Sequence, residues 1–342
     1  MSDLNRPDFV CHAPFNNLEL LPNGAVACCG AFFTGEFHVR AKNAGTDYKA
    51  LWNGPEYLDL RRSMLDGSYR HCTERCPEYL AIRNQTSHMR RDTAGPKIKS
   101  CIETGQVTMT AGPRILALSN DMSCNLKCRS CRADYIHDRR EHHDALFDKT
   151  VAMLEEVGKD IETLAFSSTG EPFFSRYYLR LMREYLCREK LPKACVHIGT
   201  NGTLLTPAMW GTLKCSDMIH LICVSVDAAT PETYAITRGF DWERLLANLR
   251  FLQTLKDSKV IGWFQLRMVV QAVNWREMEA FYELAISLSA DPVYQLVYPW
   301  GTLTDKDMIY YPSHPDYPAF MEHLRAFDAR HPKVEAYYRQ LL

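Results

Sequence analysis

Three cysteines stand close together near the middle of the chain, at positions 124, 128 and 131. Cysteine thiolates are soft ligands that suit zinc and iron–sulfur clusters, and this spacing lets one loop wrap around one metal centre. Three ligands leave one iron of a four-iron cluster without a protein ligand. In catalytic metal sites such an open position is where a substrate or cosubstrate binds.

The spacing C-x3-C-x2-C, on a loop after the apolar run Ile115–Leu118, resembles the signature of the radical SAM enzymes. The resemblance implies that Cys124, Cys128 and Cys131 hold a [4Fe–4S] cluster whose fourth iron binds S-adenosylmethionine. It also implies reductive cleavage of this cosubstrate to a 5′-deoxyadenosyl radical, which abstracts a hydrogen atom from the substrate. The residues alone leave open a zinc site or buried free thiols.

Later segments resemble the parts of that family that bind S-adenosylmethionine. Each follows a predicted strand, which is where barrel enzymes carry their chemistry. The run Ser168–Pro172 is similar to the motif for the amino group, and Thr200–Gly202 is similar to a neighbouring turn. Ser225 and Arg238 are similar to residues that hold the carboxylate, for which guanidinium is well shaped, and Asp227 shares the strand face of Ser225. The resemblance implies these cofactor-binding residues: Gly170, Glu171, Thr200, Asn201, Ser225, Asp227 and Arg238.

Other polar residues near these motifs have two interpretations. Gln271 and Asn274 follow the fifth predicted strand and can reach nucleoside groups, but Asn274 with Glu277 also reads as a helix capping box. Cys223 is either a buried core thiol or the hydrogen-atom donor to a substrate radical that an epimerase needs. The pair His142-His143 lies in a polar run and is expected to be solvated surface.

The first 95 residues carry a second group of cysteines. Pro22-Asn23-Gly24 lies between short apolar segments and predicts a hairpin turn, which folds Cys11 and Cys29 toward each other. A helix with Tyr57, Leu60 and Met64 on one face is predicted to follow and to end near Gly67. The pair Cys72 and Cys76 comes directly after it.

Hairpin, helix and cysteine pair resemble the auxiliary-cluster unit called a twitch or SPASM domain. The resemblance implies that Cys11, Cys29, Cys72 and Cys76 hold a second [4Fe–4S] cluster, with Cys28 as the spare thiol. This chain departs from the family in placing the unit before the barrel. Structural zinc stays open as the alternative, because four cysteines also bind zinc well.

From residue 113 onward, predicted strands alternate with helices, which indicates an α/β fold with a parallel sheet and right-handed crossovers. The family resemblance implies a partial (β/α)6 TIM-like barrel preceded by the small hairpin-plus-helix auxiliary-cluster domain. The strands are expected at 115–119, 163–167, 195–199, 221–226, 264–270 and 293–298. The domains are predicted as 1–95 (auxiliary cluster), 96–112 (linker), 113–300 (barrel) and 301–342 (C-terminal helical tail).

Composition limits the classes of partner. The 342 residues are 46% hydrophobic and 24% charged with a net charge of −1, so neither nucleic acid nor a membrane surface is indicated as a partner. No signal peptide or membrane-spanning run is recognisable, and a cytoplasmic location is expected. Thirteen cysteines, several of them clustered, indicate metal binding or catalysis in a reducing compartment.

The leading prediction is a radical SAM oxidoreductase or epimerase that carries two [4Fe–4S] clusters and uses S-adenosylmethionine. Its substrate is expected to be a small carbohydrate- or amino-type metabolite, and its electron source a reducing protein such as flavodoxin or ferredoxin. One alternative is a maturase that modifies a ribosomally made precursor peptide. The other, from a different class, is a non-catalytic iron–sulfur electron carrier.

Overall fold

The computed structural model describes residues 8–22, 24–29, 39–40, 51–74, 76–84, 87, 89–166, 169–298 and 301–341. Asn23 and Ser168, which belong to two of the predicted motifs, lie outside these residues. The chain divides into two compact units. The first comprises Met1–Asp121, Ala145–Ala165 and Cys187–Ala194, and the second comprises Met122–Asp144, Phe166–Leu186 and Cys195–Leu342.

The predicted hairpin is present in the first unit. Strands β1 (Asn17–Leu20) and β2 (Ala25–Ala27) pair antiparallel, and β3 (Val39–Arg40) pairs with β2. Gly24 in the turn has φ 75°, a left-handed conformation that glycine adopts without strain. The hairpin predicted from the sequence is therefore present, with glycine in the left-handed conformation of its turn.

Strand β1 has a second partner that the sequence did not predict. It pairs in parallel with β4 (Ile115–Leu118), the strand that leads into the cysteine loop, with Asn17 opposite Ile115 and Leu20 opposite Leu118. The order in this part of the sheet is β4-β1-β2-β3. The hairpin is thus hydrogen-bonded to the first strand of the predicted barrel.

Helices α1 (Ala13–Asn16), α3 (Pro55–Leu65), α4 (Pro77–Arg83) and α5 (Pro96–Thr104) complete the N-terminal part of the first unit. Helix α3 buries Tyr57, Leu60 and Met64, as its apolar spacing predicted. Helix α5 lies inside the predicted linker: a proline opens it, and Gly105 ends it in the left-handed conformation. The prediction of a linker did not include this helix.

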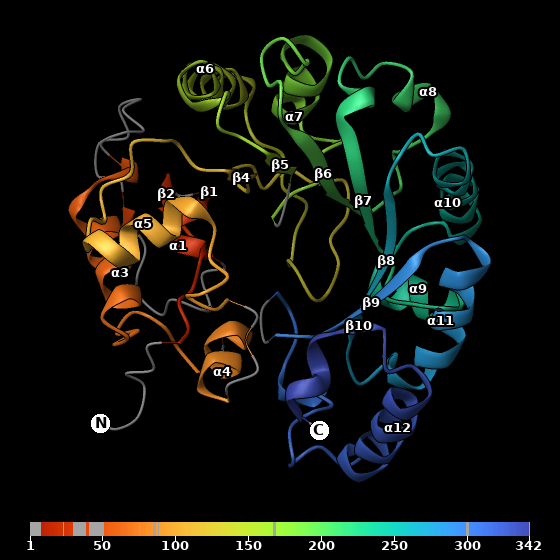
Figure 1. The fold of residues 1–342 in the computed structure, drawn as a ribbon. Coiled ribbons are helices and arrows are strands. Elements are labelled where there is room, and N and C mark those ends of the chain that lie inside the picture. The colour runs from red at the N-terminus through yellow and green to blue at the C-terminus, as the bar shows by residue number, and fades with distance from the viewer. Residues whose placement is uncertain are drawn as a thin grey trace. The chain divides into compact units, whose positions relative to one another are not determined.

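The second unit is built on a parallel sheet in the order β10-β9-β8-β7-β6. Figure 1 shows helices α10 and α11 on the outer side of these strands. The strands are β6 (Cys195–Thr200), β7 (Ile219–Ser225), β8 (Trp263–Val270), β9 (Asp291–Leu296) and β10 (Glu335–Ala336). The α-helices are α7 (Arg176–Arg180), continued by a π-helical turn (Leu181–Tyr185), α8 (Pro207–Trp210), α9 (Pro231–Thr237), α10 (Trp242–Asp257), α11 (Met278–Ser287) and α12 (Tyr317–Arg330).

Strand β5 (Thr163–Phe166) and helix α6 (Arg140–Val157) complete the alternation of strands and helices along the chain. The predicted α/β class, with the alternation of a partial (β/α)6 barrel, is confirmed, and each of the six predicted strands overlaps an observed one. Strand β10, in the predicted helical tail, was not expected. No helix in the described part of the chain is long and apolar enough to cross a membrane.

Asn274 and Glu277 do not form the predicted capping box. The Asn274 amide donates to the carbonyls of Asp227 and Val269 (both 2.9 Å), and its oxygen accepts from the Gln271 backbone. Glu277 accepts hydrogen bonds from the segment around Thr230 instead. The prediction was wrong because buried backbone groups at the ends of β7 and β8 satisfy the Asn274 side chain, which is fully buried.

Candidate active site

The three cysteines of the predicted signature lie on one compact loop of the second unit. Cys124 and Cys128 are buried, Cys131 is exposed, and none of them forms a disulfide. The loop folds back on itself, since the Cys131 and Arg132 backbone amides both donate to the Cys128 carbonyl at 2.9 and 3.0 Å. A hydrogen bond from the Cys124 amide to the Ile136 carbonyl closes its far end. One short segment therefore presents all three thiols.

Each thiol faces hydrogen-bond donors. The Cys124 sulfur accepts from the Leu126 amide at 3.4 Å, and the Cys128 sulfur accepts from Nη1 of Arg238 at 3.6 Å. Nε and Nη2 of Arg132 both lie 3.3 Å from the Cys131 sulfur. Such donors stabilise a thiolate, which is the form that binds metal.

Arg132 was not predicted from the sequence, although it directly follows the third cysteine. Its guanidinium also donates to the carbonyl of Met122 at 2.6 Å and to the carbonyl of Thr169. It therefore joins the cysteine loop to the predicted amino-group motif, and it is 92% buried while doing so, since only 8% of its surface is exposed. A buried arginine with this many partners is a fixed part of the site.

Glu171 is hydrogen-bonded to residues at the carboxyl end of β6. Its carboxylate accepts from the Thr200 hydroxyl and the Asn201 amide, both at 2.7 Å, and from the Phe173 amide at 3.2 Å. Its own backbone amide donates to the carbonyl of Ser123, next to the first cysteine, at 2.8 Å. Burial raises the pKa of Glu171 to about 7, and the three hydrogen bonds oppose that rise. Three predicted cofactor residues are thus brought together at the cysteine loop.

A chain of amides extends this arrangement. The Asn201 side chain donates to Asn125 at 2.9 Å and lies 3.9 Å from the Cys124 sulfur, and Asn125 donates to Thr203 at 2.9 Å. Asn125 and Thr203 were not singled out from the sequence. The available signal was their position: Asn125 lies between the first two cysteines, and Thr203 directly follows the Thr200–Gly202 motif.

Asp227 and Arg238 form a buried ion pair of 2.7 Å, with side chains that are 0% and 11% exposed. Asp227 has φ 63°, a left-handed conformation that is uncommon for a residue other than glycine, and it also accepts from the Val269 amide at 2.8 Å. The pair holds the Arg238 guanidinium at the Cys128 sulfur. Ser225 ends β7 two residues earlier and is half-buried.

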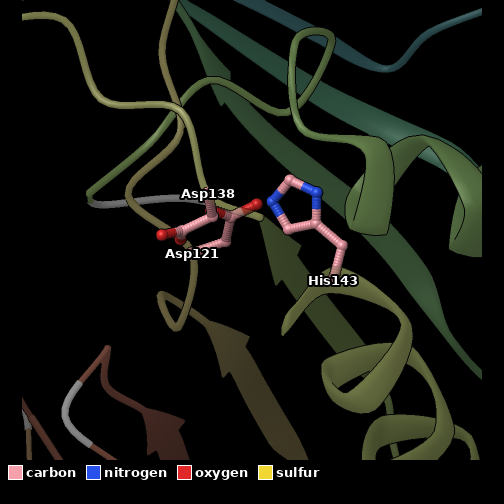
Figure 2. Close-up of side chains that lie close together, drawn as sticks. All are labelled: Asp121, Asp138 and His143. Carbon is pink, nitrogen blue, oxygen red and sulfur yellow. The ribbon is translucent and has the colours of Figure 1, made fainter. Parts of the chain in front are cut away.

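The structure also corrects the prediction that His143 lies on the solvated surface. It is buried, and its Nε2 lies 3.1 Å from the Ser123 hydroxyl, whereas His142 is exposed as expected. Figure 2 shows the His143 imidazole, carried by α6, directed toward the loop of Asp138. The prediction for His143 was wrong because the first turn of α6 packs on the cysteine loop, so that one of two adjacent histidines faces inward.

The four predicted auxiliary cysteines come together in the first unit. Cys11, Cys29, Cys72 and Cys76 are all half-buried and free. Burial raises the pKa of Cys11, and the negative charges that Cys72, Cys29 and Cys76 would carry raise it further, which places the four thiols within electrostatic reach of one another. Cys28 is buried and donates to the Cys29 sulfur at 3.6 Å, and its thiol is also within electrostatic reach of Cys11 and Cys72.

The C-terminal tail passes directly over the cysteine loop. The Thr302 amide and hydroxyl donate to the Arg129 carbonyl at 2.9 and 3.1 Å, and Asp307 pairs with the Arg129 guanidinium at 3.1 Å. A Cβ on Gly301 would lie 2.5 Å from the Arg129 carbonyl and 2.8 Å from the Cys131 amide. Only glycine permits this approach, and no sequence motif had marked it.

A cavity of about 630 Å³ lies elsewhere, at the amino ends of β8 and β9, where Trp263, Asp291 and His331 contribute to its lining. Parallel α/β sheets carry their chemistry at the carboxyl ends of the strands. The thiols, the Glu171 cluster and the Asp227–Arg238 pair all gather at that opposite end. The cavity is therefore not assigned to the active site.

Comparison with known proteins indicates the class. Residues 123–285 match the family model of the radical SAM superfamily, so this segment of the chain is similar to a radical SAM domain. The AdoMet-dependent heme synthase of Methanosarcina barkeri is 30% identical over 186 residues, which are 54% of this chain and 50% of that protein. The chain therefore spans about half the length of the curated relative that it matches.

Two solved structures are similar at lower identity. The structure of TYW1 with a lysine–pyruvate adduct is 16% identical, with a TM-score of 0.41 over 64% of this chain and 72% of that one. Streptococcus suis SuiB bound to S-adenosylmethionine is 11% identical, with a TM-score of 0.47 over 81% of this chain and 58% of that one. Scores this low carry no weight for function.

The radical SAM family model that residues 123–285 match implies a [4Fe–4S] cluster and S-adenosylmethionine, and the site has the donors that such groups need. Three free thiols on one loop suit the cluster. Burial raises the pKa of Cys124 to about 11, and a bound metal would favour its thiolate form. The Tyr234 hydroxyl and Nε of Arg238 are buried without a hydrogen-bond partner among the described residues. Unpaired buried donors of this kind are expected where a polar ligand belongs.

Proposed function

We propose that this chain is a radical SAM oxidoreductase or epimerase that acts on a small carbohydrate- or amino-type metabolite. The observation that supports it is the convergence of three free thiols, the Glu171 cluster and the Asp227–Arg238 pair in the second unit. When bound, the cluster and its cosubstrate supply a radical that removes a hydrogen atom from the substrate. The name of the matched relative, a heme synthase, also favours a small molecule over a peptide.

The residues of the chain have distinct roles in this proposal. Cys124, Cys128 and Cys131 hold the cluster, and Arg132 and Arg238 donate hydrogen bonds to the sulfur ligands, which offsets their negative charge. Gly170, Glu171, Thr200, Asn201 and Ser225 contact the cosubstrate. Asp227 acts as a positioning residue, since it orients Arg238 through the 2.7 Å ion pair.

The four auxiliary cysteines, Cys11, Cys29, Cys72 and Cys76, are proposed to hold a second [4Fe–4S] cluster. Their mutual electrostatic effects and their half-buried positions support one shared centre. A second cluster held by these cysteines would supply an acceptor for the electron that remains after hydrogen abstraction, which would favour oxidation. A flavodoxin- or ferredoxin-type protein is the proposed electron source, and the cytoplasm the proposed location.

Anaerobic reconstitution tests the proposal. We expect about eight irons per chain for wild type and about four for both Cys128→Ala and Cys72→Ala. Only Cys128→Ala should abolish formation of 5′-deoxyadenosine by dithionite-reduced protein. Cys195→Ala, which removes a half-buried thiol outside both groups, is the matched control and should behave as wild type.

Deuterium transfer from labelled candidate metabolites into 5′-deoxyadenosine then identifies the substrate. Reduced wild type that never converts S-adenosylmethionine to 5′-deoxyadenosine would instead be an electron carrier. Transfer from a peptide but from none of the metabolites would make the protein a maturase.

A further inference from the structure

The two faces of strand β8 differ in chemical character. Phe264, Leu266, Met268 and Val270 are buried on one face, which packs under helices. The opposite face carries Gln265, Arg267 and Val269. This inner face of β8, at the concave side of the parallel sheet, is where a barrel enzyme has room for a substrate.

Arg267 lacks an ion-pair partner among the residues that the structure describes, and its Nε is buried without a hydrogen-bond partner there. The neighbouring Asp227 carboxylate does not serve it, because one oxygen pairs with Arg238 at 2.7 Å and the other accepts from the Val269 amide at 2.8 Å. A half-buried guanidinium left unpaired is unfavourable unless a ligand supplies the acceptor.

The strand register places Arg267 among polar neighbours. Ser225 of β7 lies directly opposite it, and Cys223 lies opposite Gln265 one pair earlier. Strand alternation with this register puts Arg267 on the same face of the sheet as Cys223. Arg267 also lowers the pKa of the Cys223 thiol, against the larger raising effect of burial. Arg267 is therefore located beside Ser225, a residue proposed to contact the cosubstrate.

The surrounding charge favours an anion with a single negative charge. The Glu335 carboxylate raises the pKa of Cys223 and accepts from Gln265 at 3.3 Å, and Asp227 is within electrostatic reach of Arg267. The Asp227 carboxylate offsets part of the arginine charge, and the Glu335 carboxylate adds negative charge near Cys223. A carboxylate is consequently a better match than a phosphate dianion, and its planar pair of oxygens suits the guanidinium fork.

We propose that Arg267 binds a carboxylate group of the substrate on the inner face of β7 and β8, beside Cys223. The inference rests on the proposed function, and it narrows the substrate class to metabolites that carry a carboxylate. The hydrogen atom to be removed would then belong to a carbon near the Cys223 thiol. Arg267 binds and orients the substrate, and it does not take part in bond breaking.

Acetate is the probe for this site, and acetamide is its neutral isostere. Calorimetric titration of reconstituted wild type, at an ionic strength held constant, should show saturable acetate binding and none of acetamide. Arg267→Gln should weaken acetate binding roughly 10- to 100-fold, as expected for loss of a charge-assisted hydrogen bond to a partly buried ligand. Arg325→Gln removes the same charge from an exposed position and should bind acetate as wild type does.

Four results would overturn the assignment. The first is absence of saturable acetate binding to wild type, and the second is equal binding by wild type and Arg267→Gln. The third is tighter binding of inorganic phosphate than of acetate. In the fourth, saturating S-adenosylmethionine displaces acetate, which would assign Arg267 to the cosubstrate. The titration needs no turnover, so a protein that binds acetate but never forms 5′-deoxyadenosine disproves the proposed function alone.

Discussion

The buried Asp227–Arg238 pair permits a quantitative test of how the active site is held together. Replacing Asp227 by Asn removes the charge and leaves the Arg238 guanidinium buried without its counter-ion. Breaking such a pair costs about 3–5 kcal/mol, and we expect about 3 kcal/mol here because the Cys128 sulfur still accepts from Arg238. Asn is the appropriate replacement, since it tolerates the left-handed φ of 63° at this position.

Two further variants separate the contributions. Asp227→Ala also removes the acceptor of the Val269 amide and places a Cβ-bearing residue without a polar side chain at positive φ, so it should cost about 1–3 kcal/mol more. Glu184→Gln breaks the exposed pair with Arg180, whose side chains are 60% and 34% exposed. That variant should unfold as wild type does, because surface pairs contribute little.

Anaerobic urea denaturation of preparations with matched iron content, followed by tryptophan fluorescence, is the assay. With a slope of about 3 kcal/mol per molar urea for a chain of this size, Asp227→Asn should lower the midpoint by about 1 M. A midpoint indistinguishable from that of Glu184→Gln would refute the reasoning. The pair would then not be screened from water as its burial indicates.

Three other predictions follow from the same contacts. Burial raises the pKa of Glu171 from 4.5 to about 7, so the folded state retains a proton that the unfolded chain loses. The stability that this proton contributes, up to about 3 kcal/mol, is present below pH 4.5 and lost as the pH rises to 7. Glu171→Gln should flatten that part of the urea midpoint–pH profile, and parallel profiles would contradict it. Gly202→Ala places a Cβ 2.7 Å from a β7 side chain at φ 73°, and it should lower the free energy of unfolding in urea by about 2–4 kcal/mol. Gly105 has a similar φ of 69° but open space around it, so Gly105→Ala should lower that free energy by only about 1 kcal/mol. Cys29→Ala should lose about four irons and Cys28→Ala none, and the reverse pattern in iron analysis would exchange their roles.

Local signals in the sequence predicted most of the second unit. Cysteine spacing and strand-like runs depend only on neighbouring residues. Thr206-Pro207 is likewise a local signal for a helix start, and the Thr206 hydroxyl accepts from the Met209 amide at 3.1 Å. Glu171, Thr200 and Asn201 were also found, because each follows a strand in a recognisable motif.

Features that depend on contacts between distant segments could not be predicted in this way. Asn274 has the sequence context of a helix cap, yet its amide is needed 47 residues away at the Asp227 carbonyl. Gly301 is an ordinary glycine in sequence and becomes necessary only because the tail crosses the cysteine loop. Arg132 is one of 40 basic residues until its burial against Cys131 is known.

The parallel pairing of β1 with β4 has a consequence for how this protein can be divided. A fragment that begins at residue 113, where the barrel was predicted to start, lacks β1, the neighbour of β4. The backbone donors and acceptors of the four paired residues of β4 would then be left without partners on that side. Such a truncation would be prone to self-association through the exposed strand. An expression fragment that contains the cysteine loop should therefore also contain the hairpin, because β1 and β4 belong to the same hydrogen-bonded sheet.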